Sequence, residues 1–411
     1  MPNLDAKTTA NSEAPRKVLL LVESSRAYGR GCLMGIASYV RTHGPWQVLH
    51  LERGLHEEVP AFIRGQHFDG VITRLENKQL AKAVTKLGIP TVDLLGIVLP
   101  THGIMFDTDP ETCSQLAFEH FRQRGFQRLA FCGYNGVTFS DQRRDAFLRQ
   151  CKSEDITPFV FDASENTANP KTDFKNTIEG IVQREGQAEL PELALVQWLK
   201  SLTGPVGIFA CNDVRGRQVL QAAAIAGRRS PDEIAVLGVD DDEVICELAN
   251  PPLSSIEPDT HRIGFEGAMA LERLMRGETF DHRQILIPPR RISVRRSSDL
   301  LAIDDQQVAA AVHFIRQHAC EGIGVKQVAA AVAISRVTLE RRFRAILDRS
   351  PREEIERVRI EQVRLMLTQT RYSLMQIATM TGYRSDAHLV TAFRRHEDCT
   401  PGVYRRRFKN S

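Results

Sequence analysis

The chain has 411 residues, of which 42% are hydrophobic and 26% are charged. This balance is typical of a soluble globular protein with roughly two to four domains, and it excludes a disordered chain, a collagen-like repeat and a disulfide-stapled miniprotein. No apolar run approaches the roughly 18 residues of a membrane helix, and residues 1–17 lack the apolar core of a secretory signal, so we expect a cytoplasmic protein without a membrane partner.

The net charge of +3 is divided unevenly along the chain. From residue 300 onward, 19 Lys and Arg stand against 12 Asp and Glu, a net charge of +7, and the remainder carries −4. An acidic body with a basic end is the pattern expected of a nucleic-acid-binding module joined to another domain. The eight cysteines are scattered, with no Cys-x-x-Cys and no Cys/His cluster, so we expect no metal site, no catalytic residue and no cofactor.

Residues 1–15 predict a disordered tail, and residues 16–297 predict an α/β domain. Apolar runs rich in strand-forming residues occur at 18–23, 46–52, 70–75, 90–95, 103–107, 128–134, 157–162, 205–212 and 234–240. Amphipathic helical patterns lie between most of them, at 33–44, 77–88, 112–125, 143–154 and 216–228. Such alternation indicates parallel sheets covered by helices on both faces, and nine units exceed one doubly wound sheet, so we predict two lobes. The polar stretch 162–192 predicts a loop.

A glycine-rich segment after the first strand resembles a dinucleotide-binding fingerprint. Its glycines are spaced G-x-G-x-x-x-G from Gly29 to Gly35, and residues 24–28 intervene where a tight turn should follow the strand at once. The spacing therefore favours the start of a helix, where glycines relieve the backbone, over a nucleotide-binding site.

Polar residues stand at the predicted carboxyl ends of several strands. Ser25 and Tyr28 follow the first strand, Asn212 follows GIFAC, Asp240 follows AVLGV, and Arg143 is expected to open the helix after FCGY. Ligands of parallel α/β folds bind beyond the carboxyl ends of strands, so we expect these side chains to converge on one cleft. Amides, carboxylates and a guanidinium suit a neutral ligand rich in hydroxyl groups. Taken alone, each residue is better explained as a helix cap or a polar loop residue, and it is their joint placement that favours a ligand site.

This part of the chain resembles the type I periplasmic-binding-protein fold of the lactose-repressor-type regulators. The resemblance rests on FACND (209–213), LGVDD (237–241), LSSI (253–256) and RRDAF (143–147). It implies that Arg143, Asn212 and Asp240 contact a sugar. Those regulators carry a helix-turn-helix before the lobes, whereas here about 15 polar residues precede the first strand.

Residues 300–411 contain a helix-turn-helix pattern twice, at about 325–347 and 374–395. In the first copy, helix 325–332 and a two-residue turn lead to the N-cap Ser335 and a second helix. In the second copy, Ser385 takes the same place, and a long helix over 353–370 joins the two. Two copies in the basic part of the chain strongly indicate an all-α DNA-binding domain.

The basic domain resembles the AraC-type DNA-binding domain. The shared motifs are SRVTLERRFR (335–344), IATMTGY (377–383), FRR (393–395) and TPGVYR (400–405). The family usually has Gly after each recognition helix, where Asp348 and Asp398 stand here, and an aromatic residue where Leu389 stands. A lobed domain followed by this module is the architecture of bacterial xylose-operon activators, and residues 313–323 resemble their domain-junction helix.

The two recognition helices offer different side chains to DNA. On the first helix, arginines can donate two hydrogen bonds to guanine, Glu340 can accept one from cytosine, and Val337 can contact a thymine methyl. The second helix has few side chains that can make two hydrogen bonds to one base. Arginines around the second helix suit phosphates, which position the protein without reading sequence. A solvated surface is the alternative for any single arginine. The predicted DNA-binding residues are Ser335, Arg336, Val337, Glu340, Arg341, Arg384, Ser385, Asp386, Ala387, Thr391, Arg394 and Arg395.

The sequence thus predicts a sugar-responsive transcription factor, an activator of a catabolic operon for a xylose-like pentose. Its expected partners are promoter DNA, a small sugar, a second copy of the chain and RNA polymerase. The alternative is a doubly wound α/β enzyme with an appended nucleic-acid-binding module, but no Ser-His-Asp order, nucleophile elbow, P-loop or metal cluster supports it. A sugar-transport binding protein is disfavoured because no secretory signal is present.

Overall fold

The computed structural model describes residues 15–52, 65–75, 78–95, 103–161, 193–299 and 305–409. The chain divides into two compact units, Met1–Leu300 and Leu301–Ser411. Apart from Pro15, the expected disordered tail lies outside the described residues, and so does the loop expected at 162–192.

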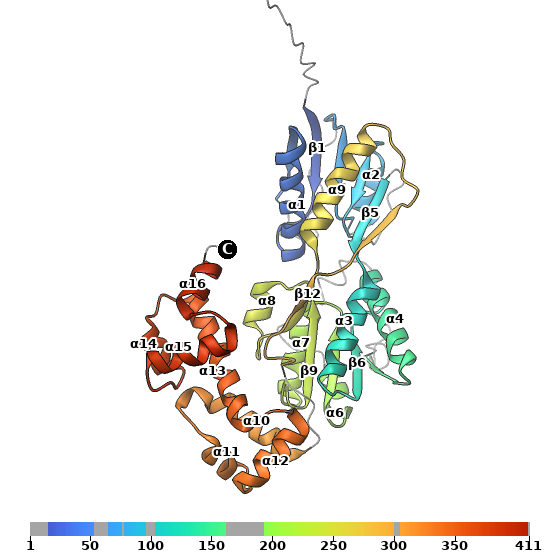
Figure 1. The fold of residues 1–411 in the computed structure, drawn as a ribbon. Coiled ribbons are helices and arrows are strands. Elements are labelled where there is room, and N and C mark those ends of the chain that lie inside the picture. The colour runs from blue at the N-terminus through green and yellow to red at the C-terminus, as the bar shows by residue number, and fades with distance from the viewer. Residues whose placement is uncertain are drawn as a thin grey trace, which may run out of the picture. The chain divides into compact units, whose positions relative to one another are not determined.

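The first unit is built on two sheets, each with six strands in its described residues (Figure 1). The first sheet has the order β11-β5-β4-β3-β1-β2 and is parallel throughout. The second has the order β12-β10-β9-β8-β6-β7, and β12 alone is antiparallel to its neighbour. The strands are β1 (Arg16–Leu21), β2 (Trp46–His50), β3 (Gly70–Thr73), β4 (Thr91–Asp93), β5 (Gly103–Thr108), β6 (Arg128–Cys132), β7 (Phe159–Val160), β8 (Val206–Ala210), β9 (Ile234–Val239), β10 (Ser254–Glu257), β11 (Gln284–Ile287) and β12 (Arg291–Ser293).

Helices cover these sheets and define two lobes. Lobe 1 is the first sheet with α1, α2 and α9, and lobe 2 is the second sheet with α3, α4, α6, α7 and α8. The described chain crosses between the lobes after β5, after β10 and after β11. The helices are α1 (Ala27–His43), α2 (Lys78–Thr85), α3 (Pro110–Gln123), α4 (Thr138–Ser153), α6 (Leu193–Ser201), α7 (Asp213–Ile225), α8 (Glu243–Leu248) and α9 (Thr260–Met275).

The alternation of side chains along β1 shows how lobe 1 is filled. Val18 and Leu20 point to the core beneath α1 and α9, whereas Leu19 and Leu21 point to the core beneath α2. All four are almost fully buried. A strand that is apolar at every position is expected where helices cover both faces of a parallel sheet, so the predicted two-lobed α/β fold is confirmed.

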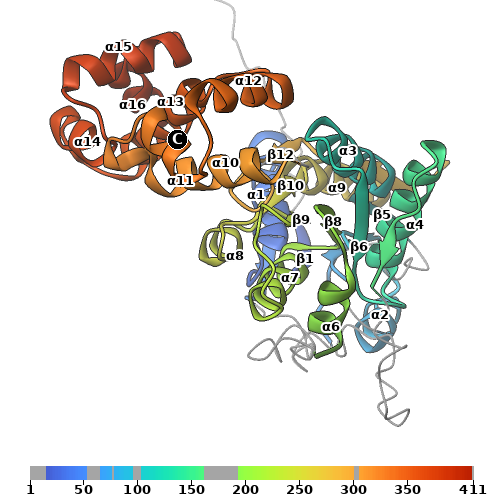
Figure 2. The same ribbon diagram turned by 90° about the horizontal axis from the view of Figure 1, so that it is seen from below.

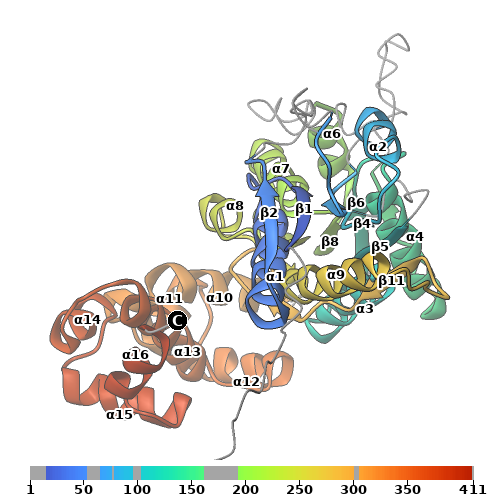
Figure 3. The same cartoon turned by 90° about the horizontal axis from the view of Figure 1, so that it is seen from above.

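The glycines of the fingerprint-like segment serve helix packing. α1 begins at Ala27, so these glycines lie inside the helix rather than before it, contrary to the expected start near residue 33. A Cβ on Gly31 would lie 2.0 Å from Thr260 Oγ1, and one on Gly35 would lie 2.0 Å from the His261 carbonyl. The close packing of α1 on α9, visible in Figure 3, therefore requires glycine at both positions.

The second unit is helical in its described residues, and α13 packs against both helix-turn-helix motifs (Figure 2). The motifs are α11–α12 and α14–α15, as predicted. The elements are α10 (Gln306–His318), the 3₁₀ turn η3 (Ala319–Glu321), α11 (Val325–Ala331), α12 (Arg336–Leu347), α13 (Pro351–Gln369), α14 (Leu374–Met380), α15 (Asp386–Glu397) and α16 (Pro401–Lys409).

Local capping explains why these helices start and stop where the sequence predicts. The hydroxyl of Ser335 accepts from Thr338 N, and the hydroxyl of Ser385 accepts from His388 N. Asp348 and Asp398 end the two recognition helices in the left-handed conformation, both at φ 51°. Aspartate thus takes the place that glycine usually fills at this position, at a modest cost in stability.

Candidate functional site

A cluster of polar side chains joins the two lobes at the carboxyl ends of their strands. Tyr28, in the first turn of α1, donates from its hydroxyl to Asp107 Oδ1 at 3.2 Å and lies 3.3 Å from Thr108 Oγ1. The guanidinium of Arg143 in lobe 2 interacts electrostatically with Asp107 and with Asp240. The structure therefore brings two predicted ligand residues, Tyr28 and Arg143, to the carboxylate of Asp107, which the sequence did not single out, and Arg143 links the third, Asp240, to this cluster.

Arg143 is held inside the protein by its position on α4. It lies in the second turn of that helix rather than at its start, because α4 begins at Thr138, which corrects the expectation from sequence. Its side chain is 5% exposed and donates to the Cys211 carbonyl. Burial lowers the pKa of Arg143, but Cys113, Asp240 and Asp107 raise it, so the guanidinium keeps its charge.

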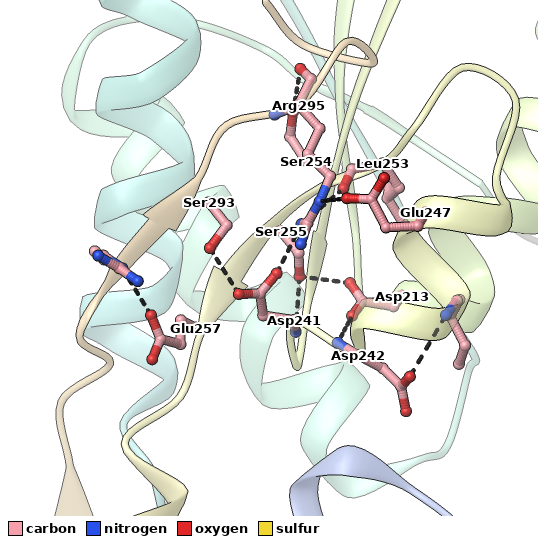
Figure 4. Close-up of polar contacts among 12 residues, drawn as sticks. Asp213, Asp241, Asp242, Glu247, Leu253, Ser254, Ser255, Glu257, Ser293 and Arg295 are labelled. Carbon is pink, nitrogen blue, oxygen red and sulfur yellow. Dashed lines mark hydrogen bonds and ion pairs between the residues drawn. The ribbon is translucent and has the colours of Figure 1, made fainter. Parts of the chain in front are cut away.

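The two aspartates that follow Asp240 have different partners (Figure 4). Asp241 pairs with Arg295 at 2.7 Å and accepts from the Ser293 hydroxyl at 2.6 Å. The backbone N–H of Asp242 donates to the buried carboxylate of Asp213 at 2.8 Å. The turn at Asp240, with φ 112°, is thus held by the contacts of the two residues that follow it and by its own N–H, which donates to the Ile256 carbonyl at 3.1 Å.

Asp242 also bridges the two lobes. Its Oδ2 accepts from Ala27 N at 3.0 Å and lies 3.9 Å from a guanidinium nitrogen of Arg30. Ala27 is the first residue of α1, so its N–H has no partner within the helix, and Asp242 supplies one from lobe 2. The same carboxylate caps α8 by accepting from Ile245 N.

The remaining two predicted ligand residues, Asn212 and Ser25, are not part of the cluster itself. Asn212 is 7% exposed and caps α7, because its Oδ1 accepts from Arg215 N at 2.9 Å. It follows Cys211, whose carbonyl receives Arg143, so it stands beside the cluster. Ser25 is exposed, and its carbonyl accepts from Arg30 at 2.8 Å. This contact with Arg30 does not join Ser25 to the cluster.

A cavity of about 270 Å³ opens where the crossover segments meet the aspartate turn. Asp240 lines it, so this predicted ligand residue faces open space. The segments after β10 and β11 provide most of the other walls. The lining residues are Ala27, Asp240, Asp241, Glu257, Pro258, Asp259, Thr260, His261, Arg290 and Arg291.

Sequence reasoning missed a buried ion pair beneath Tyr28. Glu23 is fully buried and pairs with Arg74, and the Arg74 guanidinium lies 4.7 Å from the centre of the Tyr28 ring. Both residues directly follow apolar strands, VLLLV and GVIT, so the signal that drew attention to Asp240 was present here too.

Asp107 makes the stability of the first unit depend on pH. Burial raises its pKa to about 6, although Arg143, Arg74 and the bonds from Thr108 and Tyr28 lower it. An unfolded Asp titrates near pH 3.9. The folded state therefore holds more protons between about pH 4 and pH 6, and stability is lost as pH rises through this window.

We expect Asp107→Asn to flatten this part of the stability profile, by on the order of 2 kcal/mol across the window. Urea unfolding of the ligand-free chain at several pH values, followed by a signal from the first unit, measures the difference. Parallel profiles for the variant and the wild type would contradict this role of Asp107.

The recognition helices expose most of the residues that the sequence assigned to DNA. Val337 is 75% exposed, and Arg341, Arg384 and Arg394 are exposed and form no ion pair with the residues that the structure describes. Arg336 pairs with Glu340 at 2.9 Å within α12.

The other predicted DNA-binding residues are distributed along their helices, from the caps Ser335 and Ser385 to Arg395 in the last turn of α15. Ser335 and Ser385 serve as caps, and Asp386 Oδ1 accepts from Ala387 N at 2.8 Å. The Thr391 hydroxyl donates to the Ala387 carbonyl at 3.0 Å. Arg395, expected to contact phosphate, pairs instead with Glu356 of α13.

Two classes of site are not found among the described residues. No group of three or more His, Cys, Asp or Glu is arranged to hold a metal ion there. Among the described helices, none combines the length and the apolar character required to span a membrane.

Comparison with known proteins matches both units. A periplasmic binding protein-like domain matches residues 118–298, and a helix-turn-helix domain matches residues 328–407. The xylose operon regulatory protein of Escherichia coli K12 is 29% identical over 399 residues, which cover 95% of this chain and 96% of that protein. The Haemophilus influenzae protein of the same name is 28% identical, covering 95% and 98%.

A solved structure extends the similarity to three dimensions. The structure of a xylose-binding transcription activator has 28% sequence identity and a TM-score of 0.73, covering 96% of this chain and 98% of that one. These relatives are regulators of transcription, so the enzyme alternative is not supported. The chain thus combines a periplasmic binding protein-like domain with a helix-turn-helix domain, and over nearly its whole length it is similar to these regulators of transcription.

Proposed function

We propose that the chain is a cytoplasmic activator of a sugar-catabolic operon that binds a neutral pentose, such as xylose, between its lobes. The observation that carries the proposal is the cluster of Tyr28, Asp107, Arg143 and Asp240, which draws hydrogen-bonding groups from both lobes to the strand ends. The name of the curated relatives, which regulate a xylose operon, supports a pentose.

The charges around the cluster favour a neutral ligand over an acidic one. Arg74 is already paired with Glu23, and Arg143 stands among the carboxylates of Asp107 and Asp240. A sugar acid or sugar phosphate would bring another negative charge to a region where carboxylates are already in excess, whereas hydroxyl groups can donate to them. Ser25 and Asn212 are proposed to contact the ligand from the edges of the site.

Ligand binding is proposed to act through the equilibrium between open and closed lobes. A ligand shifts such an equilibrium only by its difference in affinity for the two states. Contacts to Tyr28 from one lobe and to Arg143 and Asp240 from the other are complete only when the lobes are closed. The Asp242 bridge to Ala27 would be among the contacts that change when the lobes move.

The DNA-binding unit is proposed to act in a homodimer on paired half-sites of promoter DNA and to contact RNA polymerase. Its exposed arginines predict strongly salt-dependent binding, since each phosphate that is neutralised releases counterions. We expect the logarithm of the affinity of the full chain for duplex DNA to fall with the logarithm of salt with a slope on the order of −4, about −0.9 per phosphate contact. Fluorescence anisotropy at several salt concentrations measures it, and affinity that does not change with salt would contradict the proposed interface.

Isothermal titration calorimetry with D-xylose, L-arabinose, D-ribose, D-glucose and D-xylonate tests the ligand class. The proposal predicts binding of at least one neutral pentose and none of the sugar acid. Binding of D-xylonate with no response to any neutral sugar would overturn it.

A further inference from the structure

A second cavity, open to solvent, lies within the DNA-binding unit. It has a volume of about 250 Å³ and lies between α13, α15 and the residues that begin α11. Residues of both helix-turn-helix motifs contribute to its walls. The lining residues are Ile323, Gly324, Val325, Arg352, Ile355, Glu356, Arg359, Tyr383, His388, Thr391, Ala392 and Arg395.

The walls of this cavity carry an excess of positive charge. Three arginines face one carboxylate, and that carboxylate, Glu356, pairs with Arg395. Arg359 is fixed, because its guanidinium donates to the carbonyls of Ala319 at 2.7 Å and Ile323 at 3.0 Å. Arg352 is exposed and makes no hydrogen bond or ion pair with the described part of the chain.

A buried hydroxyl completes the cavity. Tyr383 is 7% exposed, and its hydroxyl has no hydrogen-bond partner among the described residues. Burial raises the pKa of Tyr383 to about 12, and Glu356 adds to the effect, so the hydroxyl remains a protonated donor at neutral pH. Leaving a buried donor without an acceptor is costly, so a donor beside unpaired positive charge indicates an anionic acceptor from outside the chain.

The position of the cavity indicates where that acceptor comes from. His388, Thr391 and Arg395 belong to the recognition helix α15. Val325 and Arg352 also line a neighbouring cavity of about 410 Å³, whose other walls include recognition-helix residues of α12. The two cavities therefore share Val325 and Arg352, which lie between residues of the two recognition helices that line them.

We propose that the Tyr383 cavity binds a backbone phosphate of the DNA segment between the two recognition helices. Tyr383 donates its hydroxyl hydrogen to a phosphate oxygen, and Arg352 supplies the unpaired charge. This inference rests on the proposed function. It adds a contact to the DNA backbone that is made by residues lying between the two recognition helices. Such a contact positions the duplex and does not read its sequence.

Two substitutions in the full chain test the proposal. Tyr383→Phe removes the hydroxyl and keeps the ring, and Tyr372→Phe makes the same change on an exposed tyrosine outside the cavity. The probes are a duplex that the wild type selects from a random pool and an unrelated duplex. We expect Tyr383→Phe to weaken binding of both about three- to tenfold and Tyr372→Phe to change neither.

Arg352 is tested through salt dependence. Arg352→Gln should make the salt slope shallower by about 0.9, and Arg352→Lys, which keeps the charge, should retain it. If both residues hold one phosphate, the double variant Tyr383→Phe, Arg352→Gln should lose less affinity than the product of the two single losses.

Three outcomes would overturn the proposal. Tyr383→Phe could bind both duplexes like the wild type, with an unchanged unfolding temperature, which would leave water as the partner of the hydroxyl. It could alter the selected sequence, which would assign the residue to base reading. Inorganic phosphate could stabilise the wild type but not the variant while DNA affinity stays equal, which would assign the cavity to a free anion. In all three cases the wild type still binds DNA, whereas a wild type that binds no DNA would overturn the proposed function as well.

Discussion

Asp240→Asn is expected to weaken sugar binding roughly 5- to 150-fold while DNA binding in the absence of sugar stays unchanged. Asp240 lines the cavity of about 270 Å³ at the aspartate turn and interacts electrostatically with Arg143. A carboxylate accepts from two hydroxyls at once, whereas an amide places donor hydrogens against one of them, at a cost of about 1–3 kcal/mol in sugar affinity. Asparagine also tolerates the positive φ of this residue, which alanine would not, so the variant tests the side chain alone.

Asp155→Asn is the matched control for this substitution. Asp155 also has a positive φ, 55°, but it is exposed after α4 and does not line the cavity at the aspartate turn. Calorimetry should show the affinity of this control for sugar to equal that of the wild type. Sugar affinity that is unchanged in Asp240→Asn would remove Asp240 from the site.

Arg341→Ala and Arg394→Ala are expected to damage DNA binding in different ways. Both arginines are exposed and lack an ion pair with the described residues, so both are available to DNA. Arg341 stands on α12, one turn beyond Val337, where a bidentate contact to guanine is worth about 1–3 kcal/mol. Its loss should relax preference at one base pair. Arg394 stands near the end of α15, and its loss should weaken all sequences alike and flatten the salt slope.

Selection of binding sites from a randomised duplex pool separates these outcomes. The wild type should select a motif concentrated in one major-groove segment, with a second segment about 10 base pairs away held through phosphates. If Arg341→Ala selects the same motif while changes among residues 384–391 rewrite it, then α15 reads the bases and the assignment is wrong.

The DNA-binding unit could be predicted almost completely because its signals are local. A serine before each recognition helix caps it, and an aspartate in the left-handed conformation ends it. These contacts join residues within a few positions of each other, so the sequence alone displays them. Leu389, which replaces the usual aromatic residue, is fully buried in the core of the second motif, so the smaller side chain still packs there.

The lobed unit could be predicted in its regular part and not at its crossovers. All nine expected strands are present, but β10, β11 and β12 were not expected as strands. Their residues are short polar or proline-flanked runs whose pairing depends on strands of distant sequence position. The sequence also did not predict helix α9. Its close packing on α1 leaves no room for a side chain at Gly31 or Gly35.

For the candidate ligand site, the sequence predicts which residues take part but not which of them contact one another. Tyr28, Arg143 and Asp240 each follow the carboxyl end of a strand, β1 in one lobe and β6 and β9 in the other. Asp107 was taken as the last residue of a strand, and nothing local shows that Tyr28 and Arg143 meet around it. Contacts across lobes, such as Asp242 with Ala27, arise from the fold as a whole and leave no pattern in sequence.

The central claim is that sugar binding in the lobes and DNA binding by the helix-turn-helix motifs are coupled in one chain. The most direct measurement is the affinity of the full chain for its selected duplex with and without saturating sugar, together with its affinity for that sugar with and without the duplex. Linkage requires that both affinities change by the same factor, which we expect to lie between about 5 and 150. Sugar that binds with full affinity and leaves DNA affinity unchanged at every concentration would contradict the account.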